Sequence, residues 1–361
     1  MKGIHKISII IFCIVITSIL IWIYYIHQIR NVRAIVKMFS NDSVFPYFVI
    51  KKHLFAELFP KKDLFAELFP KKDLFVELFP KKFLEMALLG LTLDLIRAEY
   101  KKPEPAWHDT YWDKASKDYI INEANQTSDF DPTNVRRTMI QNIESSTVRT
   151  CPYGTVHVIH NGDIKDNDIP WGLWGRILRL YRKKGKPYTV FFLASPHLRE
   201  FPRQGNITPY NINGGYTYPC NHDTIVLYRA EDATRVLIHE LQHSACLDNH
   251  ALGVDRTEAE TEAWAELLYC ALLSQGNKTR FHTLVKEQSA WILSQNKRVR
   301  QFIGNSHAFP WRYTVGKEEV WRRWNILKIT PTSYTNSLRL TMPPSQATKK
   351  QFGVSTESII L

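Results

Sequence analysis

The pattern of apolar and polar residues predicts a body built from both strands and helices. Three short runs, either alternating or dense in β-branched and aromatic residues, indicate strands: residues 155–160, 188–194 and 224–229. Residues 85–100 and 279–302 favour helices. We expect the α+β class for this body.

A further helix, around residues 236–243, carries candidate chemistry. His239 and His243 are spaced by four, so one helix face can present both imidazoles to a single metal ion. Glu240 follows the first histidine, where its carboxylate can meet a water activated by the metal. Zinc suits two neutral imidazoles and a carboxylate, and it lowers the pKa of a water toward neutrality. The segment therefore predicts a catalytic zinc (Zn2+) site.

A glutamate-rich helix is expected next along the chain, with Thr257 ahead of an acidic first turn as its N-cap. Glu258, Glu262 and Glu266 are spaced by four and share one face, while Glu260 points elsewhere. His-Glu-x-x-His followed by Glu-x-x-x-Glu on the next helix resembles the gluzincin zinc peptidases, the thermolysin-like and aminopeptidase-like enzymes.

This resemblance implies roles for individual residues. Glu262 would be the third zinc ligand beside His239 and His243, and Glu266 would be the outer carboxylate that orients a ligand histidine. In gluzincins, a His or Tyr several tens of residues further on stabilises the oxyanion of the attacked peptide bond. The candidates in this chain are His307 and Tyr313, with His282 behind them.

The metzincins, a rival group of zinc peptidases, do not fit. Their pattern needs Gly three residues and His six residues after the second ligand, where this chain has Cys246 and Asn249. The gluzincin resemblance implies a zincin-like fold, in which an extended substrate adds as a strand to the sheet edge before the metal helix. Residues 224–229 or residues 214–218 could form that edge.

An almost unbroken apolar run near the N-terminus indicates a transmembrane helix. Residues 7–26 have about the length that spans a bilayer, and Trp22, Tyr24 and Tyr25 stand at one end as interfacial aromatics do. No small-residue cleavage site follows, so we expect a retained single-pass anchor. The expected organisation is an anchor at residues 1–27, a stalk at 28–100, a zincin-like catalytic domain at 101–345 and a loose tail at 346–361.

The stalk contains a decapeptide repeated in tandem over residues 51–80, and each copy ends in proline, which stops a continuous helix. We interpret the repeats as a tether; an array that docks a partner is the alternative. The net charge is +12, and paired lysines begin each copy. They indicate either contact with anionic membrane lipid or a solvated basic face. Since no nucleic-acid-binding motif is present, we do not expect nucleic acid as a partner.

Four cysteines outside the anchor are compatible with two disulfides: Cys151, Cys220, Cys246 and Cys270. If the two motif helices run antiparallel with His243 level with Glu262, Cys246 and Cys270 lie roughly 16 Å apart, which excludes that pair. Glycosylation sequons favour an extracytoplasmic or lumenal body, and they stand at Asn41, Asn125, Asn206 and Asn277.

A longer stretch of the body resembles metallopeptidase-like proteins carried by large DNA viruses of algae and amoebae. The resemblance rests on residues 213–217, Arg229, the metal motif, Asp248 and residues 261–264. It implies a protein of a virion membrane or a host membrane.

These observations predict a membrane-anchored zinc peptidase, a hydrolase acting on a peptide or protein substrate. One alternative is a non-catalytic, zinc-stabilised binding protein of a membrane or virion envelope, and another is a structural membrane protein with an accidental motif. Glu240 speaks against the first alternative, because a purely structural zinc site fills its fourth position with a protein ligand and needs no base.

Overall fold

The computed structural model describes residues 81–128, 131, 134–182, 186–304, 307–327 and 335–361, with the backbone alone for residues 81–88. The expected anchor at residues 7–26 and the repeats at residues 51–80 lie outside this part of the chain. Among the described residues, no helix is long and apolar enough to cross a membrane.

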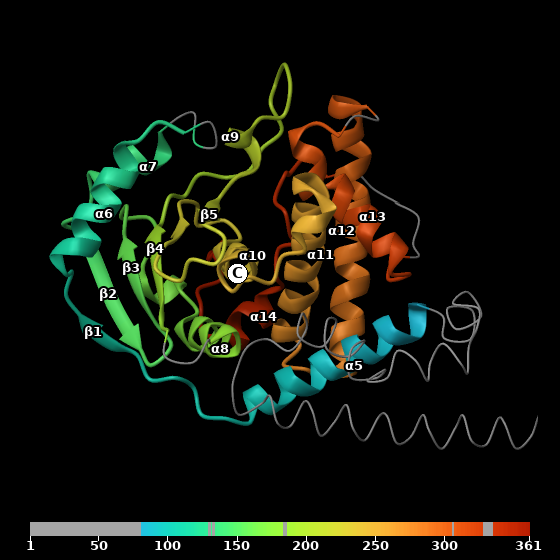
Figure 1. Cartoon of the computed structure of the whole chain (residues 1–361), viewed down its shortest axis with the longest axis horizontal. Coiled ribbons are helices and arrows are strands. Elements are labelled where there is room, and N and C mark those ends of the chain that lie inside the picture. The colour runs from blue at the N-terminus through green and yellow to red at the C-terminus, as the bar shows by residue number, and fades with distance from the viewer. Residues whose placement is uncertain (1–80, 129–130, 132–133, 183–185, 305–306, 328–334) are drawn as a thin grey trace, which may run out of the picture. The chain divides into compact units, whose positions relative to one another are not determined.

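A six-stranded mixed sheet forms one side of the body (Figure 1). Its strands are β1 (His108–Thr110), β2 (Ser146–Cys151), β3 (Gly154–Ile159), β4 (Tyr188–Leu193), β5 (Gly215–Thr217) and β6 (Ile225–Leu227). They lie in the order β1-β2-β3-β4-β6-β5; β3, β4 and β6 run parallel, and the other neighbouring pairs are antiparallel. The three strands expected from the sequence are confirmed as β3, β4 and β6. Of the two candidates for the edge strand, β5 lies at the edge and β6 lies one strand inside.

Ten α-helices occur among the described residues: α5 (Lys81–Tyr100), α6 (Lys114–Asn125), α7 (Val135–Ile140), α8 (Trp171–Tyr181), α9 (Pro209–Ile212), α10 (Ala233–Ser244), α11 (Val254–Leu273), α12 (Lys278–Ile303), α13 (Val315–Arg323) and α14 (Gln346–Gln351). Three short 3-10 helices accompany them: η1 (Asp166–Asp168), η2 (His250–Leu252) and η3 (Phe309–Tyr313). One sheet combined with a largely separate helical half agrees with the expected α+β class.

Helices cover both faces of the sheet. Neighbouring side chains of a strand point to opposite faces, so two consecutive residues of β4 contact helices on the two sides. Phe191 of β4 packs in an apolar cluster with Ile120 of α6 and with side chains of α7. Phe192, the next residue, contacts Trp174 of α8 on the other face, with ring centroids 5.4 Å apart. The Trp174 indole donates to the Thr234 hydroxyl of α10 at 2.8 Å, so α8 and α10 share this second face.

Helix α10 lies between the sheet and the layer of α11, α12 and α13 (Figure 1). Every residue of α10 is buried. Gly215 of β5 lies so close to this helix that a Cβ built on it would stand 2.8 Å from Cγ1 of Val236. The edge strand therefore passes directly against the helix that carries the two histidines.

The body begins before residue 101, where the sequence placed its boundary. Helix α5 packs against α11. Arg97 of α5 donates to the Gly276 carbonyl at 2.7 Å, and the Tyr100 hydroxyl donates to the Leu272 carbonyl at 3.1 Å. The assignment of residues up to 100 to a stalk is therefore wrong for the C-terminal part of α5.

Residues 346–361 are ordered, and the expectation of a loose tail is wrong. Ile360 and Leu361 are fully buried. The amides of Asp232 and Thr234, at the start of α10, donate to the carbonyls of Ile359 and Ile360, both at 2.9 Å. Since the first amides of a helix have no acceptor within the helix, this segment supplies acceptors at the N-terminus of α10.

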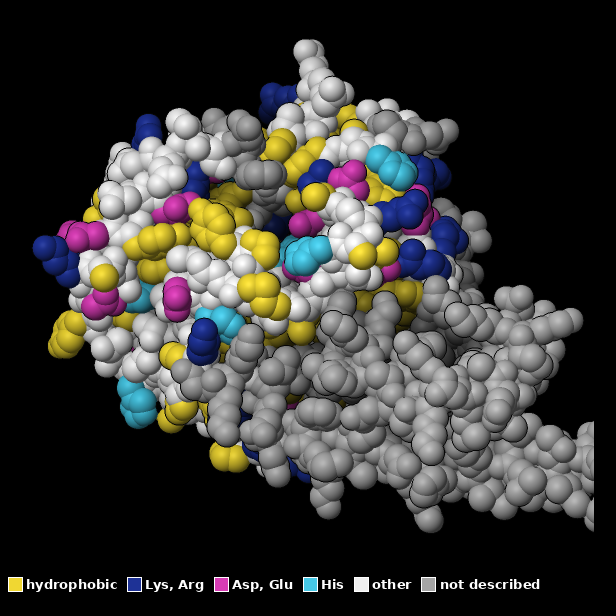
Figure 2. Space-filling model, in the orientation of Figure 1, with side chains coloured by type: hydrophobic (Ala, Val, Ile, Leu, Met, Phe, Trp, Pro, Cys, Tyr) yellow, Lys and Arg dark blue, Asp and Glu magenta, His cyan; other side chains and the backbone are white. Residues whose placement is uncertain are grey.

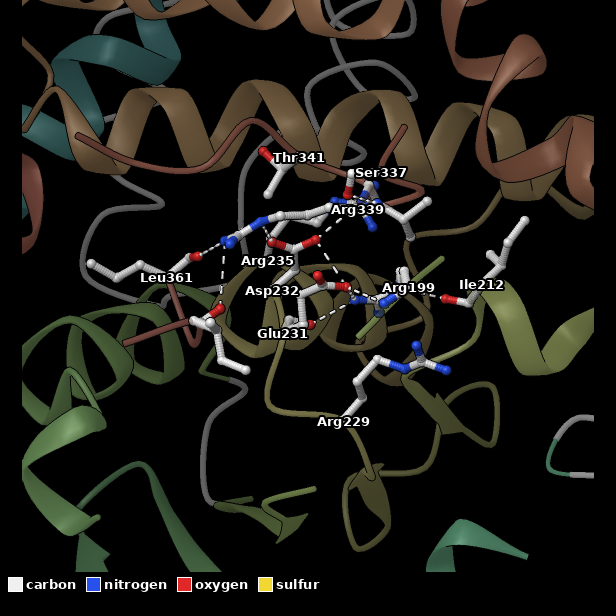
Figure 3. Close-up of polar contacts among 12 residues, drawn as sticks. Arg199, Ile212, Arg229, Glu231, Asp232, Arg235, Ser337, Arg339, Thr341 and Leu361 are labelled. Atoms are coloured by element: carbon white, nitrogen blue, oxygen red, sulfur yellow. Dashed lines mark hydrogen bonds and ion pairs between the residues drawn. The ribbon is translucent and has the colours of Figure 1, made fainter. Parts of the chain in front are cut away.

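Buried charges surround this contact (Figure 3). The Arg339 guanidinium forms an ion pair with Asp232 at 2.5 Å and donates to the Leu361 carbonyl. Arg199 donates to the Glu231 carbonyl at 2.7 Å and to its carboxylate at 3.2 Å. The N-terminus of α10 is thus fixed by both ion pairs and main-chain hydrogen bonds.

We expect the substitution Ile360→Ala to lower the free energy of unfolding by about 2–5 kcal/mol, as truncation of a buried aliphatic side chain does. Denaturant unfolding followed by circular dichroism measures this change. Glu357→Ala, at an exposed position of the same segment, is the control and should stay within about 0.5 kcal/mol of the parent. Equal, small changes in the free energy of unfolding at both positions would instead support a loosely attached tail.

Candidate metal centre

The two histidines of α10 turn the same ring nitrogen toward each other. Nε2 of His239 lies 3.0 Å from Nε2 of His243. Glu240 offers a carboxylate oxygen nearby, and the ligand atoms of these three residues all lie within 4.8 Å of one another. The helical spacing of four residues therefore brings the predicted motif residues together.

Glu258 of α11 is the carboxylate that faces both Nε2 atoms. Its oxygens lie 3.5 Å from Nε2 of His239 and 3.7 Å from Nε2 of His243. The Glu258 side chain is 21% exposed, so the cluster reaches the surface. On the face shown in Figure 2, histidine and acidic side chains lie beside a hollow between the sheet side and the helical layer.

Asp248 holds the opposite nitrogen of His243. Its carboxylate lies 2.7 Å from Nδ1 of His243 and accepts a hydrogen bond from the Thr261 hydroxyl at 3.2 Å. Histidines that bind metals through one ring nitrogen usually donate from the other to a carboxylate or carbonyl. Asp248 was not expected at the site; its signals in the sequence are its place five residues after His243 and its part in the resemblance to the viral proteins.

Glu262, the third ligand expected from the sequence, lies on the Nδ1 side of His239. Its Oε1 approaches Nδ1 at 3.0 Å, without the alignment of a hydrogen bond. Both of its carboxylate oxygens accept from the guanidinium of Arg235, and Lys317 Nζ lies 4.0 Å away. The structure thus gives Glu262 a buried ion pair, and it places Glu258 beside the Nε2 atoms.

Glu266, expected to orient a ligand histidine, lies deeper in the same charge cluster. It accepts from Lys317 Nζ at 3.2 Å and from the Thr341 hydroxyl at 2.5 Å, and Nε of Arg235 lies 3.6 Å away. The role of orienting a histidine, which the sequence assigned to Glu266, is filled at Nδ1 of His243 by Asp248. At Nδ1 of His239, Glu262 is the carboxylate that comes near.

The helix that carries these glutamates begins one turn earlier than expected. Gly253 is its N-cap, and Thr257 is its fourth residue, with a hydroxyl that donates to the Asn249 carbonyl at 2.9 Å. The expectation that Thr257 caps the helix is wrong. Glu258 is therefore in the second turn of the helix and not at its first position, and its side chain faces the histidines of α10.

The positions of these donors can be compared with the geometry of a zinc site. Four ligands at about 2.0–2.1 Å in a tetrahedron lie about 3.3 Å from one another. The two Nε2 atoms lie 3.0 Å apart, while one oxygen of Glu258 lies 3.5 Å from Nε2 of His239 and its other oxygen lies 3.7 Å from Nε2 of His243. Two imidazoles and one carboxylate are also the donor set of many catalytic zinc sites, which keep the fourth position open.

In the metal-free site, the pKa values of the two histidines are shifted in opposite directions. Burial lowers the pKa of His239 to about 4. Burial would also lower the pKa of His243, but the carboxylates of Asp248, Glu258 and Glu240 outweigh it and raise the pKa to about 9. Burial raises the pKa of Glu240 to about 8. At neutral pH, His243 therefore carries a proton that faces His239, where a metal ion would compete with it.

This proton predicts a pH dependence of metal affinity. Below about pH 9, a metal ion must displace the His243 proton, so the apparent affinity should rise by about tenfold for each pH unit between pH 6 and pH 8. Calorimetric titration in buffers of different ionisation enthalpy should also detect at least one proton released per ion. A flat profile with no proton release would contradict the assignment of His243 as a ligand.

The three candidates for an oxyanion donor lie in different surroundings. Tyr313, on η3 beside α11, has a pKa raised by burial and further by the negative charges of Glu258 and Glu240. His307 is exposed and stacks on Trp311 with ring centroids 4.1 Å apart. His282 is exposed on α12. The structure therefore favours Tyr313 as the candidate beside the site.

One disulfide occurs among the described residues, and it joins Cys220 to Cys246. Cys151 and Cys270 are buried thiols. The exclusion of a Cys246–Cys270 pair is confirmed.

No family model, no curated protein and no solved structure matches this chain.

Proposed function

We propose that this protein is a zinc-dependent peptidase whose metal is held by His239, His243 and Glu258. The observation that carries the proposal is the convergence of the two Nε2 atoms and the Glu258 carboxylate, while Asp248 holds Nδ1 of His243. This ligand set replaces the one expected from the sequence, because both oxygens of Glu262 already bind Arg235.

The chemistry that a bound zinc ion supplies is the acidification of a water molecule and the polarisation of the peptide carbonyl. Glu240 is buried within reach of the ligand atoms. Its carboxylate takes the proton of the attacking water and passes it to the leaving amine, as a general base and then a general acid. Tyr313 keeps its proton because burial raises its pKa, so its hydroxyl can donate to the carbonyl oxygen as negative charge develops there.

Strand β5 is the surface we propose for the substrate main chain. It pairs with β6 along one edge, is partly exposed and lies against α10 through Gly215 and Val236. An extended peptide that adds to the other edge of β5 would be held beside the histidines by main-chain hydrogen bonds. Main-chain recognition suits a peptide or protein substrate of varied sequence.

The proposal is tested with the purified chain by zinc analysis and by cleavage of a peptide library, read by mass spectrometry with and without a chelator. We expect about one zinc per chain and cleavage that the chelator stops. Stable zinc binding without cleavage would favour the non-catalytic binding protein. Failure to bind zinc would overturn the metal site itself.

The role of Tyr313 predicts that Tyr313→Phe lowers kcat by about 10–100-fold and changes KM little, because the lost hydrogen bond forms mainly in the transition state. His307→Ala is the matched control and should leave both constants within about twofold, since its ring is exposed on Trp311. The opposite order of effects would assign the oxyanion donor to His307. Both variants are compared at equal zinc content.

The proposal includes a cellular location for the body. We retain a single-pass membrane protein with an extracytoplasmic or lumenal body as the expected setting, and a virion membrane as one form of it. The disulfide and the exposed sequon residues Asn125, Asn206 and Asn277 support an oxidising compartment.

A further inference from the structure

The Cys220–Cys246 disulfide lies directly at the candidate metal centre. Cys220 follows the edge strand β5, and Cys246 follows Ala245, the C-cap of α10. The bond therefore joins the segment after the proposed substrate strand to the end of the helix that carries both histidines.

Both cysteines are tied to His243 through the main chain. The amides of Cys220 and Cys246 each donate to the His243 carbonyl at 3.0 Å. Next to them, the Ser244 hydroxyl donates to the Asn221 carbonyl. The disulfide thus closes a small group of contacts around the backbone of a proposed ligand.

The backbone of both cysteines is in the left-handed region, with φ 64° at Cys220 and φ 60° at Cys246. Residues with a side chain adopt this region rarely, and they stay in it when the surrounding structure holds them there. A covalent bond between the two residues restricts both segments at once. Without that bond, each segment is freer to leave the left-handed conformation.

The loop that begins at Cys246 carries Asp248 to His243. Only Leu247 separates the half-cystine from Asp248, whose carboxylate lies 2.7 Å from Nδ1 of His243. A change of backbone conformation at Cys246 would therefore move the carboxylate that orients this imidazole. Loss of such an orienting partner typically costs about 10–100-fold in metal affinity.

We propose that the disulfide is a reversible positioning element of the metal site, an inference that rests on the proposed zinc function. When the disulfide is formed, it holds Asp248 against His243. When it is reduced, the affinity of the site for zinc falls. Both half-cystines are exposed, so an external reductant can reach them.

The chemical step is thiol–disulfide exchange with an external dithiol. A thiolate of the dithiol attacks one sulfur, breaks the Cys220–Cys246 bond and forms a mixed disulfide. The second thiolate of the reductant then releases the protein. The two cysteines gain two electrons and two protons, and the dithiol becomes a disulfide.

The test compares the zinc affinity of the full chain before and after reduction. A phosphine reductant replaces the dithiol in the assay, because dithiols themselves bind zinc; the phosphine is oxidised to its oxide as the disulfide becomes two thiols. We expect reduction to weaken zinc binding by about 10–100-fold, and reoxidation to restore it. The visible spectrum of bound Co2+ should change in parallel, since it reports the ligand geometry at the metal.

Two variants separate this role from general stabilisation. Cys220→Ser with Cys246→Ser should bind zinc as weakly as the reduced chain and should not respond to the reductant. Asp248→Ala, with the disulfide intact, should bind weakly and lose most of the response, because the disulfide acts through Asp248. Cys151 and Cys270 are unchanged in all variants and control for effects on the buried thiols.

Equal zinc affinity of the oxidised and reduced chain would overturn the inference and leave the zinc function standing. A response to the reductant that persists in Asp248→Ala would also overturn it. If no form of the chain binds zinc, the proposed function fails first. If the double serine variant does not fold, the reversible change in the parent chain and the Asp248→Ala comparison still decide the question.

Discussion

Replacing Glu240 by Gln should lower peptide hydrolysis by at least about a hundredfold while zinc remains at about one ion per chain. The amide keeps the shape of the side chain but cannot accept the proton of the attacking water. The change should disturb folding little, because the amide has the shape of the carboxyl group and burial already raises the pKa of Glu240, which disfavours its charged form. Rates and zinc content are measured on the same preparation.

Glu260→Gln is the matched control for this substitution. Glu260 stands on α11 and pairs with Arg323, whose side chain is 47% exposed, at 2.5 Å. We expect its loss to change hydrolysis by less than about twofold, as surface ion pairs contribute little. Full activity of Glu240→Gln would remove Glu240 from the mechanism, and loss of zinc from that variant would give it a ligand role instead.

Substitutions of Glu258 and Glu262 should separate the two glutamates that are candidates for the third ligand. Glu258→Gln should weaken zinc binding by more than about a hundredfold, because it removes the only charged ligand in the proposed set. The metal-free protein should lose less stability than it does in Glu262→Gln, since the Glu258 side chain is 21% exposed and that of Glu262 is buried.

Glu262→Gln should lower the stability of the protein more, and its zinc affinity less, than Glu258→Gln does. It leaves Arg235 and Lys317 buried without their full carboxylate charge. Breaking one partner of a buried ion pair costs about 3–5 kcal/mol in the free energy of unfolding. Zinc affinity should fall by about 10–100-fold, through the contact with His239 alone.

The measurements are denaturant unfolding of the metal-free variants and zinc titration of the same samples. If Glu262→Gln abolished zinc binding while Glu258→Gln bound normally, the ligand set expected from the sequence would be correct. Glu266→Gln should also lower the free energy of unfolding, as Glu262→Gln does, because Lys317 and Thr341 donate hydrogen bonds to the Glu266 carboxylate.

The parts of the site that depend on local periodicity could be predicted from the sequence. A helix places residues four apart on one face, so His239 and His243 had to present their rings together. Alternating or β-rich runs predicted three of the strands, while β5 was offered as a candidate edge only through the gluzincin resemblance. In each of these cases, the relevant contacts are made within a few residues along the chain.

Which glutamate faces the histidines depends on how α11 packs against α10. Periodicity puts Glu258, Glu262 and Glu266 on one face, but successive members of this series lie about 6 Å apart along the axis of the helix. The axial position of α11 against α10 depends on the connecting loop and on the early start of α11 at Val254. A shift of one turn exchanges the roles of Glu258 and Glu262, and no local pattern reports such a shift.

The partners that neutralise or orient the site were also a tertiary matter. Lys317 reaches Glu266 across 51 positions of sequence, and Thr341 does so across 75. The carbonyls of Ile359 and Ile360 accept hydrogen bonds from the first amides of α10. Buried charges need partners because their desolvation is costly. The sequence therefore determined that partners must exist, and only the packing of distant segments decided which residues they are.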